Sequence, residues 1–459
     1  MMLMSQAANA LNGELTGADV LFTSVSKDSR EIVNGSLYVA IKGESFDGHE
    51  FVEQAGVAGA AGALVSEAQA AELPQIRVND TRRALGELAA YWRQQYTGKL
   101  VGITGSNGKT TVKEMTRSIL EHAAAANQVL STVGNLNNDI GMPMTLLSLR
   151  EQHRFAVIEM GANHPGEIDY LTHIAQPHVA VITNAGPAHL EGFGSIEKVA
   201  SSKAEIYSGI VEGGTAVINA DDVFADYWAG ICNKLGGDRS VIRFSMRDES
   251  ADVFAAITHT DGKTEVRIKT PLGDGVAQLA VPGEHNVMNA LAATAIAVAL
   301  EVSLEDIIKG LNAFGGVSGR LATCYTSSGA RIINDTYNAN PLSLNAAMNV
   351  LVAFEGDTWL VLGDMAELGD MEEELHRQVG EQARLLGIKH LLATGRLARF
   401  AVESFGRGAQ FFDDRQQLVK QLEQGIARDS VVLVKGSRSM GMEQIVNALV
   451  DERDAQGAH

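Results

Sequence analysis

The residues best suited to chemistry stand together in the stretch Thr104-Gly105-Ser106-Asn107-Gly108-Lys109-Thr110-Thr111. The apolar run from Leu100 to Ile103 precedes it, and apolar residues at helical spacing follow it, which predicts a strand, a tight loop and a helix. In such a loop the glycines let the backbone approach an anion, and the first N–H groups of the helix point toward it. Lys109 adds a positive charge, and the Thr110 hydroxyl is suited to ligate Mg²⁺. The stretch therefore predicts a site for nucleotide phosphates.

One position departs from the general phosphate-loop pattern. That pattern requires a glycine five residues before Gly108, and Ile103 stands there instead. The alternative interpretation is an ordinary glycine-rich turn between a strand and a helix. The letters Gly-Lys-Thr directly after a predicted strand favour phosphate binding, because this is the context that the motif requires.

A carboxylate, a histidine and a lysine follow at places where they could assist phosphate chemistry. Glu159 ends the apolar run from Phe155, and His189 lies in the loop after the apolar run from Val179. Because the carboxyl ends of parallel strands meet at the edge that carries the phosphate loop, both side chains could reach Mg²⁺ there. Lys203 lies on the helix that is predicted next. Each also has a plainer interpretation: a carboxylate at a strand end, a hydrogen-bonded structural histidine, and a lysine on a solvated face.

Two other polar groups stand where ligands often bind. Asn286 and Asn289 share one face of a predicted helix, where their amides could bind a purine or could equally cap the helix. Near the N-terminus, Asp28-Ser29-Arg30 and the loop 42–49 lie at the ends of predicted strands, which are frequent ligand positions in α/β folds. A solvated turn is an equally good interpretation of Asp28-Ser29-Arg30.

The order of the predicted elements indicates an α/β protein with three domains. A chain of 459 residues is too long for one core, and roughly 150 residues per domain suggests three. We expect a small N-terminal α/β domain (1–83), a central domain with a parallel sheet and the phosphate loop (84–313), and a C-terminal Rossmann-like domain (314–459). The last begins with a hinge-like, glycine-rich stretch and lacks a phosphate loop, so we expect it to supply a substrate site and a lid.

Composition excludes several classes of protein. The formal net charge of -19 argues against nonspecific binding to nucleic acid or to anionic membranes. The N-terminus lacks the basic region of a signal peptide, and the apolar run from Val287 to Val302 is too short to span a membrane, so it predicts a buried helix. Cys232 and Cys324 form no disulfide framework and no zinc motif. We therefore expect a cytoplasmic protein, and its acidic surface without an apolar stripe favours a monomer.

The whole chain resembles the Mur ligase family, ATP-dependent enzymes that form amide bonds in peptidoglycan synthesis. The stretch 104–111 matches the family's form of the phosphate loop, and Glu159, His189 and His285-Asn286 stand where the family has metal and nucleotide residues. Two later motifs, 334–341 (NDTYNANP) and 362–369 (LGDMAELG), resemble the member that adds D-alanyl-D-alanine. The Asp-Asn-Pro-Arg motif of the sibling that adds diaminopimelate is absent.

The resemblance implies a reaction and its cofactors. ATP would phosphorylate a carboxylate of UDP-N-acetylmuramoyl-tripeptide, and the amine of D-alanyl-D-alanine would attack the resulting acyl phosphate. Lys109 would hold the ATP phosphates, Thr110 and Glu159 would hold one Mg²⁺, and His189 would hold a second Mg²⁺. Lys203 would be a further Mg²⁺ ligand after carbamylation, which turns its cationic amine into a carboxylate.

The resemblance also implies further binding residues, in a site that is complete only when the domains close. ATP would be bound by Asn286, Arg320 and Asp335, and the uridine nucleotide by Ser29, Arg30, Asp47 and His49. Asn135 would contact the substrate near the reacting carboxylate. The dipeptide would be bound by Asn338 and Ser437.

Two alternatives remain open from sequence. One is another ATP-dependent amide ligase of this fold, such as folylpolyglutamate synthetase, and the motifs at 28–30, 334–341 and 362–369 argue against it. The other is a nucleotide-dependent switch, which would not need two further ligand-sized domains. The diamino acid at the third position of the tripeptide is not determined by the sequence.

Overall fold

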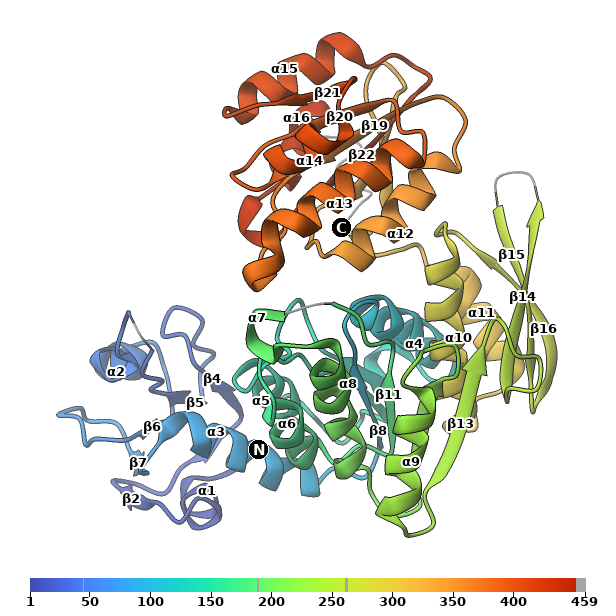
Figure 1. The fold of residues 1–459 in the computed structure, drawn as a ribbon. Helices are drawn as coiled ribbons and strands as arrows, with labels where there is room; N and C mark the ends of the chain where they lie inside the picture. Colours follow the sequence, from blue (N-terminus) through green and yellow to red (C-terminus); the bar gives the residue numbers. More distant parts are fainter. Residues whose placement is uncertain (44, 188–189, 261–262, 451–459) are drawn as a thin grey trace.

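The computed structural model describes residues 1–43, 45–187, 190–260 and 263–450. In this part of the chain, three α/β units follow one another, each built on its own larger sheet (Figure 1). In the view of Figure 1, the first unit lies to the left of the central one, and the last unit lies above the central one. The predicted α/β class with three domains is confirmed.

The first unit is a small sheet with strand order β2-β7-β6-β5-β4, in which only β2 runs antiparallel to its neighbour. The strands are β2 (Glu14–Thr16), β4 (Ser24–Ser26), β5 (Ser36–Val39), β6 (Gly62–Val65) and β7 (Gln75–Arg77). Beside them lie β1 (Met2–Leu3), β3 (Leu21–Phe22), α1 (Met4–Ala10), η1 (Gly48–Phe51) and α2 (Val52–Val57).

The helix α3 (Thr81–Gln94) connects the first unit to the central one. Its N-cap is Asp80, whose carboxylate accepts hydrogen bonds from two backbone N–H groups of the first turn. Leu85 and Leu88 on α3 belong to one buried apolar cluster that contains Leu37 of the first unit and Met142 of the central unit. The division that we propose at residue 83 therefore falls inside a helix that packs against both units.

The central unit has the strand order β16-β15-β14-β13-β12-β11-β8-β10-β9. From β9 to β14 neighbouring strands are parallel, whereas β15 and β16 add an antiparallel hairpin. The strands are β8 (Lys99–Thr104), β9 (Val129–Ser131), β10 (Phe155–Glu159), β11 (Val179–Ile182), β12 (Thr215–Asn219), β13 (Ser240–Ser245), β14 (Val253–Thr260), β15 (Lys263–Thr270) and β16 (Gly273–Leu279). The hairpin was not predicted, because apolar and polar residues alternate along its strands. A search for continuous apolar runs does not find such strands.

Helices cover both faces of the central sheet (Figure 1). On one face lie α4 (Lys109–Ala123), α10 (Glu284–Ala299) and α11 (Leu304–Ala313), and on the other α5 (Gly141–Leu146), α6 (Glu167–Ala175), α8 (Ile196–Ala204) and α9 (Ala225–Leu235). Successive strand residues alternate between the two cores, as Val157 and Ile158 do. The predicted buried helix is α10. Short elements are η2 (Ala126–Gln128), α7 (Leu190–Phe193) and η3 (Glu205–Gly209).

The last unit has the strand order β17-β18-β22-β19-β20-β21, parallel except for β17. The strands are β17 (Ala322–Tyr325), β18 (Arg331–Asp335), β19 (Asp357–Leu362), β20 (His390–Ala393), β21 (Ala409–Phe411) and β22 (Ser430–Lys435). The helices are α12 (Pro341–Val352), α13 (Glu372–Leu385), α14 (Ala398–Phe405), α15 (Arg415–Gly425) and α16 (Glu443–Leu449), with η4 (Gly369–Met371) and η5 (Arg438–Met440).

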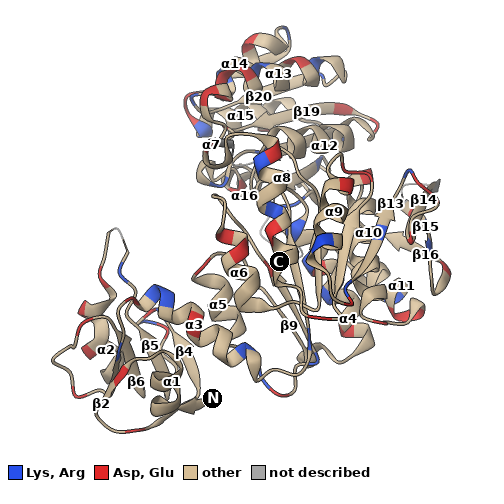
Figure 2. Ribbon diagram, turned by 60° about the horizontal axis from the view of Figure 1, so that its bottom comes forward, with Lys and Arg blue, Asp and Glu red and all other residues tan. Residues whose placement is uncertain are grey.

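Charged residues of both signs are interspersed over the helices of the units, and Figure 2 shows no single basic face in this view. Among the described helices, none combines the length and the apolar character that crossing a bilayer requires.

Candidate active site

A cleft of about 2090 Å³ lies between the central unit and the last unit. The phosphate loop and Glu159 form its floor at the carboxyl end of the central sheet, and residues of the last unit form the opposite wall. That wall includes Arg320, Asp335 and Lys435. Residues predicted from motifs more than a hundred positions apart therefore line one cavity.

The phosphate loop is tightly curled at the start of α4. Gly105 and Gly108 have φ angles of 147° and 82°, which side chains other than glycine rarely adopt. A Cβ at Gly105 would lie 2.0 Å from Thr183 Oγ1, so the close approach also requires glycine. Lys109 Nζ donates to the Gly105 carbonyl at 2.7 Å. Burial lowers the pKa of Lys109, and nearby Glu159 opposes that shift.

Unpaired donors lie beside this loop. Asn107 Nδ2 and Arg320 Nε are buried and have no hydrogen-bond partner in the described part of the chain. Because buried polar atoms normally have partners, these two indicate a ligand that accepts hydrogen bonds. The phosphate oxygens of ATP are such acceptors.

Glu159 is 2% exposed, and its carboxylate accepts a hydrogen bond from a hydroxyl of the phosphate loop. Thr110 Oγ1 donates to Glu159 Oε2 at 2.9 Å, and Asn137 Nδ2 donates to Glu159 Oε1 at 2.8 Å. A hydroxyl and a carboxylate are oxygen ligands of the kind that Mg²⁺ prefers. The described residues hold no cluster of three His, Cys, Asp or Glu side chains, so phosphate oxygens and water would have to complete the coordination. The second predicted metal ligand, His189, lies outside the described residues.

Lys203 is not on a solvated face. It is 2% exposed on α8, with Nζ 3.5 Å from the Ala162 carbonyl oxygen and 5.3 Å from the centre of the Phe193 ring. Burial, together with the charge of Lys109, lowers the pKa of Lys203 to about 7. A buried amine that is partly neutral near pH 7 is a chemically reactive group rather than a solubilising one.

The last unit contacts the phosphate loop directly through Arg320 and Asn340. Arg320 Nη2 donates to Thr110 Oγ1 at 2.9 Å, and the Arg320 guanidinium lies 4.1 Å from the centre of the Tyr337 ring. Asn340 Nδ2 donates to Asn107 Oδ1 at 2.8 Å. Thr110 therefore links the phosphate loop, the Glu159 carboxylate and the last unit through one hydroxyl.

Asp335 forms a buried ion pair with Lys435. Lys435 Nζ donates to Asp335 Oδ2 and, at 2.9 Å, to the carbonyl of Asn338. The other carboxylate oxygen of Asp335 accepts from the Leu321 N–H at 3.2 Å. Asp335 thus fixes the segment that follows Arg320, and its carboxylate still borders the cleft.

The two amides on α10 are turned toward protein groups. Asn286 Nδ2 donates to the Pro282 carbonyl at 2.7 Å, and Asn289 Nδ2 donates to Asn286 Oδ1 at 3.2 Å. The N-cap residue of α10 is Gly283, and no side chain caps this helix. The alternative interpretation, in which Asn286 and Asn289 cap the helix, is therefore wrong. Asn286 lines the cleft, and its predicted role toward adenine stays a prediction.

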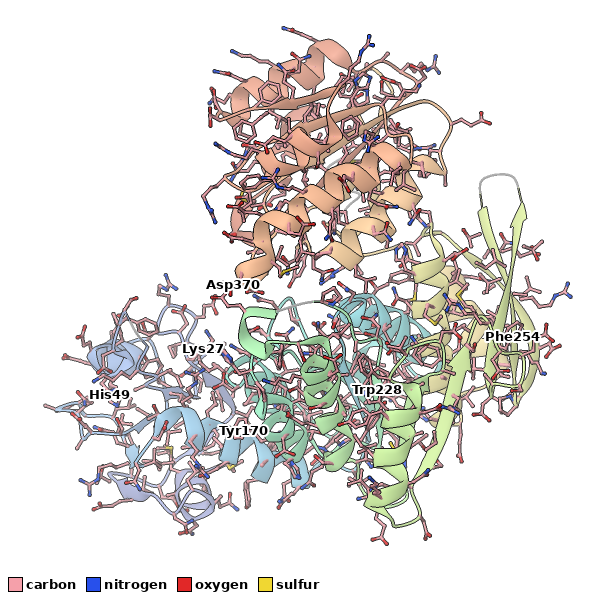
Figure 3. The ribbon with its side chains drawn as sticks, in the orientation of Figure 1. Lys27, His49, Tyr170, Trp228, Phe254 and Asp370 are labelled. Carbon is pink, nitrogen blue, oxygen red and sulfur yellow. The ribbon has the colours of Figure 1, made fainter. Side chains whose placement is uncertain are left out.

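The predicted uridine residues lie in the first unit and do not line the cleft. His49 is labelled in the first unit in Figure 3, and its side chain is 10% exposed. Asp47 accepts from His49 Nδ1 at 2.6 Å, and Arg30 pairs with Asp28 at 2.6 Å. Ser29 Oγ donates to Gln54 Oε1 at 3.4 Å. A substrate reaching both this group and Glu159 would have to span two units.

The remaining predicted substrate residues differ in access. Asn135 and Asn338 are exposed and line the cleft. Ser437 is 3% exposed, and its Oγ accepts from the Ala366 N–H at 2.6 Å. Ser437 thus helps to hold the loop 363–369. Asp370, which directly follows this loop, lies on the side of the last unit that faces the central unit (Figure 3).

Sequence reasoning did not single out several residues of the site. Asn340 stands inside the motif 334–341, and Asn137 and Lys435 each lie two residues from a predicted site residue, Asn135 and Ser437. Their position beside a predicted strand end or helix start was the available signal, but a contact such as Asn340 to Asn107 depends on how two units dock.

Three family profiles match the chain in order. The Mur ligase family catalytic domain matches residues 21–93, the Mur ligase middle domain matches 103–297, and the glutamate ligase domain of Mur ligases matches 319–438. The UDP-N-acetylmuramoyl-tripeptide–D-alanyl-D-alanine ligase of Escherichia coli (strain K12) is 44% identical over 97% of this chain and 98% of its own length. The ligase of that name from Bacillus subtilis (strain 168) is 35% identical over 93% of each chain.

Solved structures agree with these matches. MurF from Acinetobacter baumannii superposes with a TM-score of 0.89 at 39% identity, covering 97% of this chain and 98% of that one. MurF ligase from Thermotoga maritima in complex with ADP superposes with a TM-score of 0.83 at 27% identity, covering 95% and 98%.

Proposed function

This chain belongs to the Mur ligase family, and we propose that it uses ATP to join D-alanyl-D-alanine to UDP-N-acetylmuramoyl-tripeptide. The products are the UDP-linked pentapeptide, ADP and phosphate. The observation that carries the proposal is the meeting of the phosphate loop, Glu159 and Arg320 at the Thr110 hydroxyl. The full-length likeness to ligases of this name supports the choice of substrates.

The reaction has two steps. A carboxylate oxygen of the tripeptide bonds to the γ-phosphorus of ATP as the bond to the β-phosphate oxygen breaks, which gives an acyl phosphate and ADP. The amine nitrogen of the dipeptide then bonds to the acyl carbon, phosphate leaves with the carboxylate oxygen, and the amine loses a proton. Phosphoryl transfer chiefly requires positioning and charge neutralisation, which a rigid loop with a lysine can supply.

We assign roles to the residues of the cleft accordingly. Lys109 and the N–H groups at the start of α4 bind the β- and γ-phosphates, and Arg320 reaches the same phosphates from the last unit. Asn286 and Asp335 face the nucleoside, Asn135 faces the tripeptide carboxylate, and Asn338 and Ser437 serve the dipeptide. Closure of the last unit over the cleft excludes water from the acyl phosphate.

Thr110 and Glu159 provide a hydroxyl and a buried carboxylate that would hold one Mg²⁺. His189 and carbamylated Lys203 would be ligands of a second Mg²⁺. When bound, Mg²⁺ neutralises the charge that develops on the phosphate oxygens and polarises them. The residues of the first unit, Ser29, Arg30, Asp47 and His49, would bind the uridine nucleotide. We further propose that the enzyme acts in the cytoplasm as a monomer.

We propose that Lys203 is carbamylated. Carbamylation needs the neutral amine, and the pKa of about 7 leaves a large fraction neutral at physiological pH. Because the neutral fraction grows as the pH rises through 7, activation by added bicarbonate should also grow over that range. Lys203→Ala should lower kcat, and short carboxylates such as acetate should restore part of it. Rates of ADP formation check this, and absence of any rescue would contradict the carbamate role.

The bond between the units at Asn340 can be removed without disturbing α12. Asn340 Oδ1 accepts from the Ser343 N–H as the helix cap, whereas its Nδ2 donates to Asn107. Asn340→Ser keeps a capping oxygen and removes the amide donor to Asn107, without adding a charge beside the phosphate loop. We expect kcat/KM for ATP to fall about 3- to 10-fold, the equivalent of one hydrogen bond, with unchanged thermal stability. Equal kcat/KM values would show that this contact does not assist closure.

Product analysis tests the function as a whole. Purified protein is incubated with ATP, Mg²⁺, UDP-N-acetylmuramoyl-tripeptide and D-alanyl-D-alanine, with one component omitted at a time. Phosphate release should require every component, and mass spectrometry should find the pentapeptide product. Release that ignores the dipeptide would support a sibling ligase or a nucleotide switch instead.

A further inference from the structure

The two oxygens of the Glu159 carboxylate have different partners. Oε2 accepts from the Thr110 hydroxyl at 2.9 Å, whereas Oε1 accepts from Asn137 Nδ2 at 2.8 Å. We propose that Asn137 is a positioning residue that fixes this carboxylate so that Oε2 alone faces the phosphate loop and a divalent cation. The proposal rests on the proposed function for its role in catalysis, although the metal binding that it predicts can be measured separately.

A carboxylate at this place needs such a partner. The terminal torsion of glutamate is broad, so the side chain alone does not select an orientation of its two oxygens. The backbone N–H of Glu159 donates to Thr132 Oγ1 at 2.9 Å, which fixes the main chain and leaves that torsion open. A neutral amide donor to Oε1 selects one orientation without adding a charge that would repel a cation.

Asn137 is itself held in place. The backbone carbonyl of Asn137 accepts from the Gly161 N–H at 2.9 Å. A Cβ at Gly161 would lie 2.9 Å from the side-chain oxygen Asn137 Oδ1. The absence of a side chain at Gly161 therefore lets the amide approach Glu159 closely. The next residue, Asn138, accepts from the Gly141 N–H at 2.8 Å through Oδ1, which ties the loop to α5.

The loop 133–140 is also tied to the first unit. Arg82 Nη2 on α3 donates to Asp139 Oδ1 at 2.8 Å, and a second bond joins Arg82 Nε to the same carboxylate. Both residues line the cleft. Asn137 thus stands in a loop that touches the unit proposed to bind the uridine nucleotide on one side and the catalytic carboxylate on the other.

Metal binding and kinetics of two variants test the proposal. Asn137→Ala removes the amide, and Asn137→Leu removes the donor while keeping the branched shape of the side chain. Mn²⁺ affinity is measured by electron paramagnetic resonance with a nonhydrolysable ATP analogue, and kcat and KM are measured with Mg²⁺. Because loss of a partner that orients a metal ligand typically costs roughly 10- to 100-fold, we expect both the Mn²⁺ affinity and kcat to fall by about that factor. The KM for the tripeptide should change little.

Val133→Ala is the matched control, because Val133 lies in the same loop, is 71% exposed and does not line the cleft. Val133→Ala should have the same Mn²⁺ affinity and kcat as the unchanged protein. All the variants should unfold at the same temperature as the unchanged protein. Unchanged Mn²⁺ affinity in a folded Asn137→Leu protein would overturn the proposal. Failure of the unchanged protein to make the pentapeptide would instead count against the proposed function, since the Mn²⁺ measurement requires neither the tripeptide nor the dipeptide.

Discussion

Lys109→Met should lower the rate of ligation by at least about a hundredfold. The ammonium of Lys109 is the cation of the phosphate loop, and burial lowers its pKa, so it lies in surroundings where water screens charge poorly. Charge that develops on the phosphate oxygens would lose a preorganised partner, whereas the methionine preserves most of the side-chain volume. The measurement is the initial rate of ADP formation at saturating substrates, together with the affinity for ATP.

Lys198→Met is the matched control for this variant. Lys198 is an exposed lysine on α8, and its replacement should leave the rate unchanged. Both proteins should unfold at the temperature of the unchanged chain. A Lys109→Met protein that retains more than a tenth of the original rate would contradict the phosphate-binding role of the loop.

Lys435→Met should lower the free energy of unfolding of the last unit by about 3–5 kcal/mol. Lys435 is 2% exposed and Asp335 is 8% exposed, so the change leaves a buried carboxylate without its cation. Removing one partner of a buried ion pair costs far more than the pair contributes, because the remaining charge has lost its hydration as well. Denaturant unfolding, followed by a probe in the last unit such as Trp359, measures the effect.

A second replacement separates this cause from a packing defect. Asp335→Asn combined with Lys435→Met removes both charges and should recover much of the lost stability. Lys420→Met, at an exposed position on α15, should change the unfolding free energy by less than about 0.5 kcal/mol. If the double variant is as unstable as Lys435→Met, the unpaired charge is not the source.

Local sequence patterns were sufficient for the elements that carry the reaction. Continuous apolar runs ending in polar residues located β8, β10 and β11, because strands buried on both faces have that pattern. The glycines and lysine after β8 located the phosphate loop. The antiparallel hairpin of β15 and β16 escaped, since strands with one exposed face alternate instead.

Contacts between units could not be read from the sequence. Arg320 bonds to Thr110 across 210 positions, and no local pattern fixes how two units dock. The burial of Lys203 was also missed, because one lysine on a helix gives no sign of the packing around it. Its lowered pKa follows from that packing and not from its neighbours in the chain.

The path of one oxygen atom tests the central claim most directly. UDP-N-acetylmuramoyl-tripeptide labelled with ¹⁸O in the reacting carboxylate is converted with ATP and D-alanyl-D-alanine, and the released phosphate is analysed by mass spectrometry. If the carboxylate is activated as an acyl phosphate, each phosphate should carry one ¹⁸O from the tripeptide. Pentapeptide formation with unlabelled phosphate would contradict the account, because the carboxylate oxygen would then have left by another route.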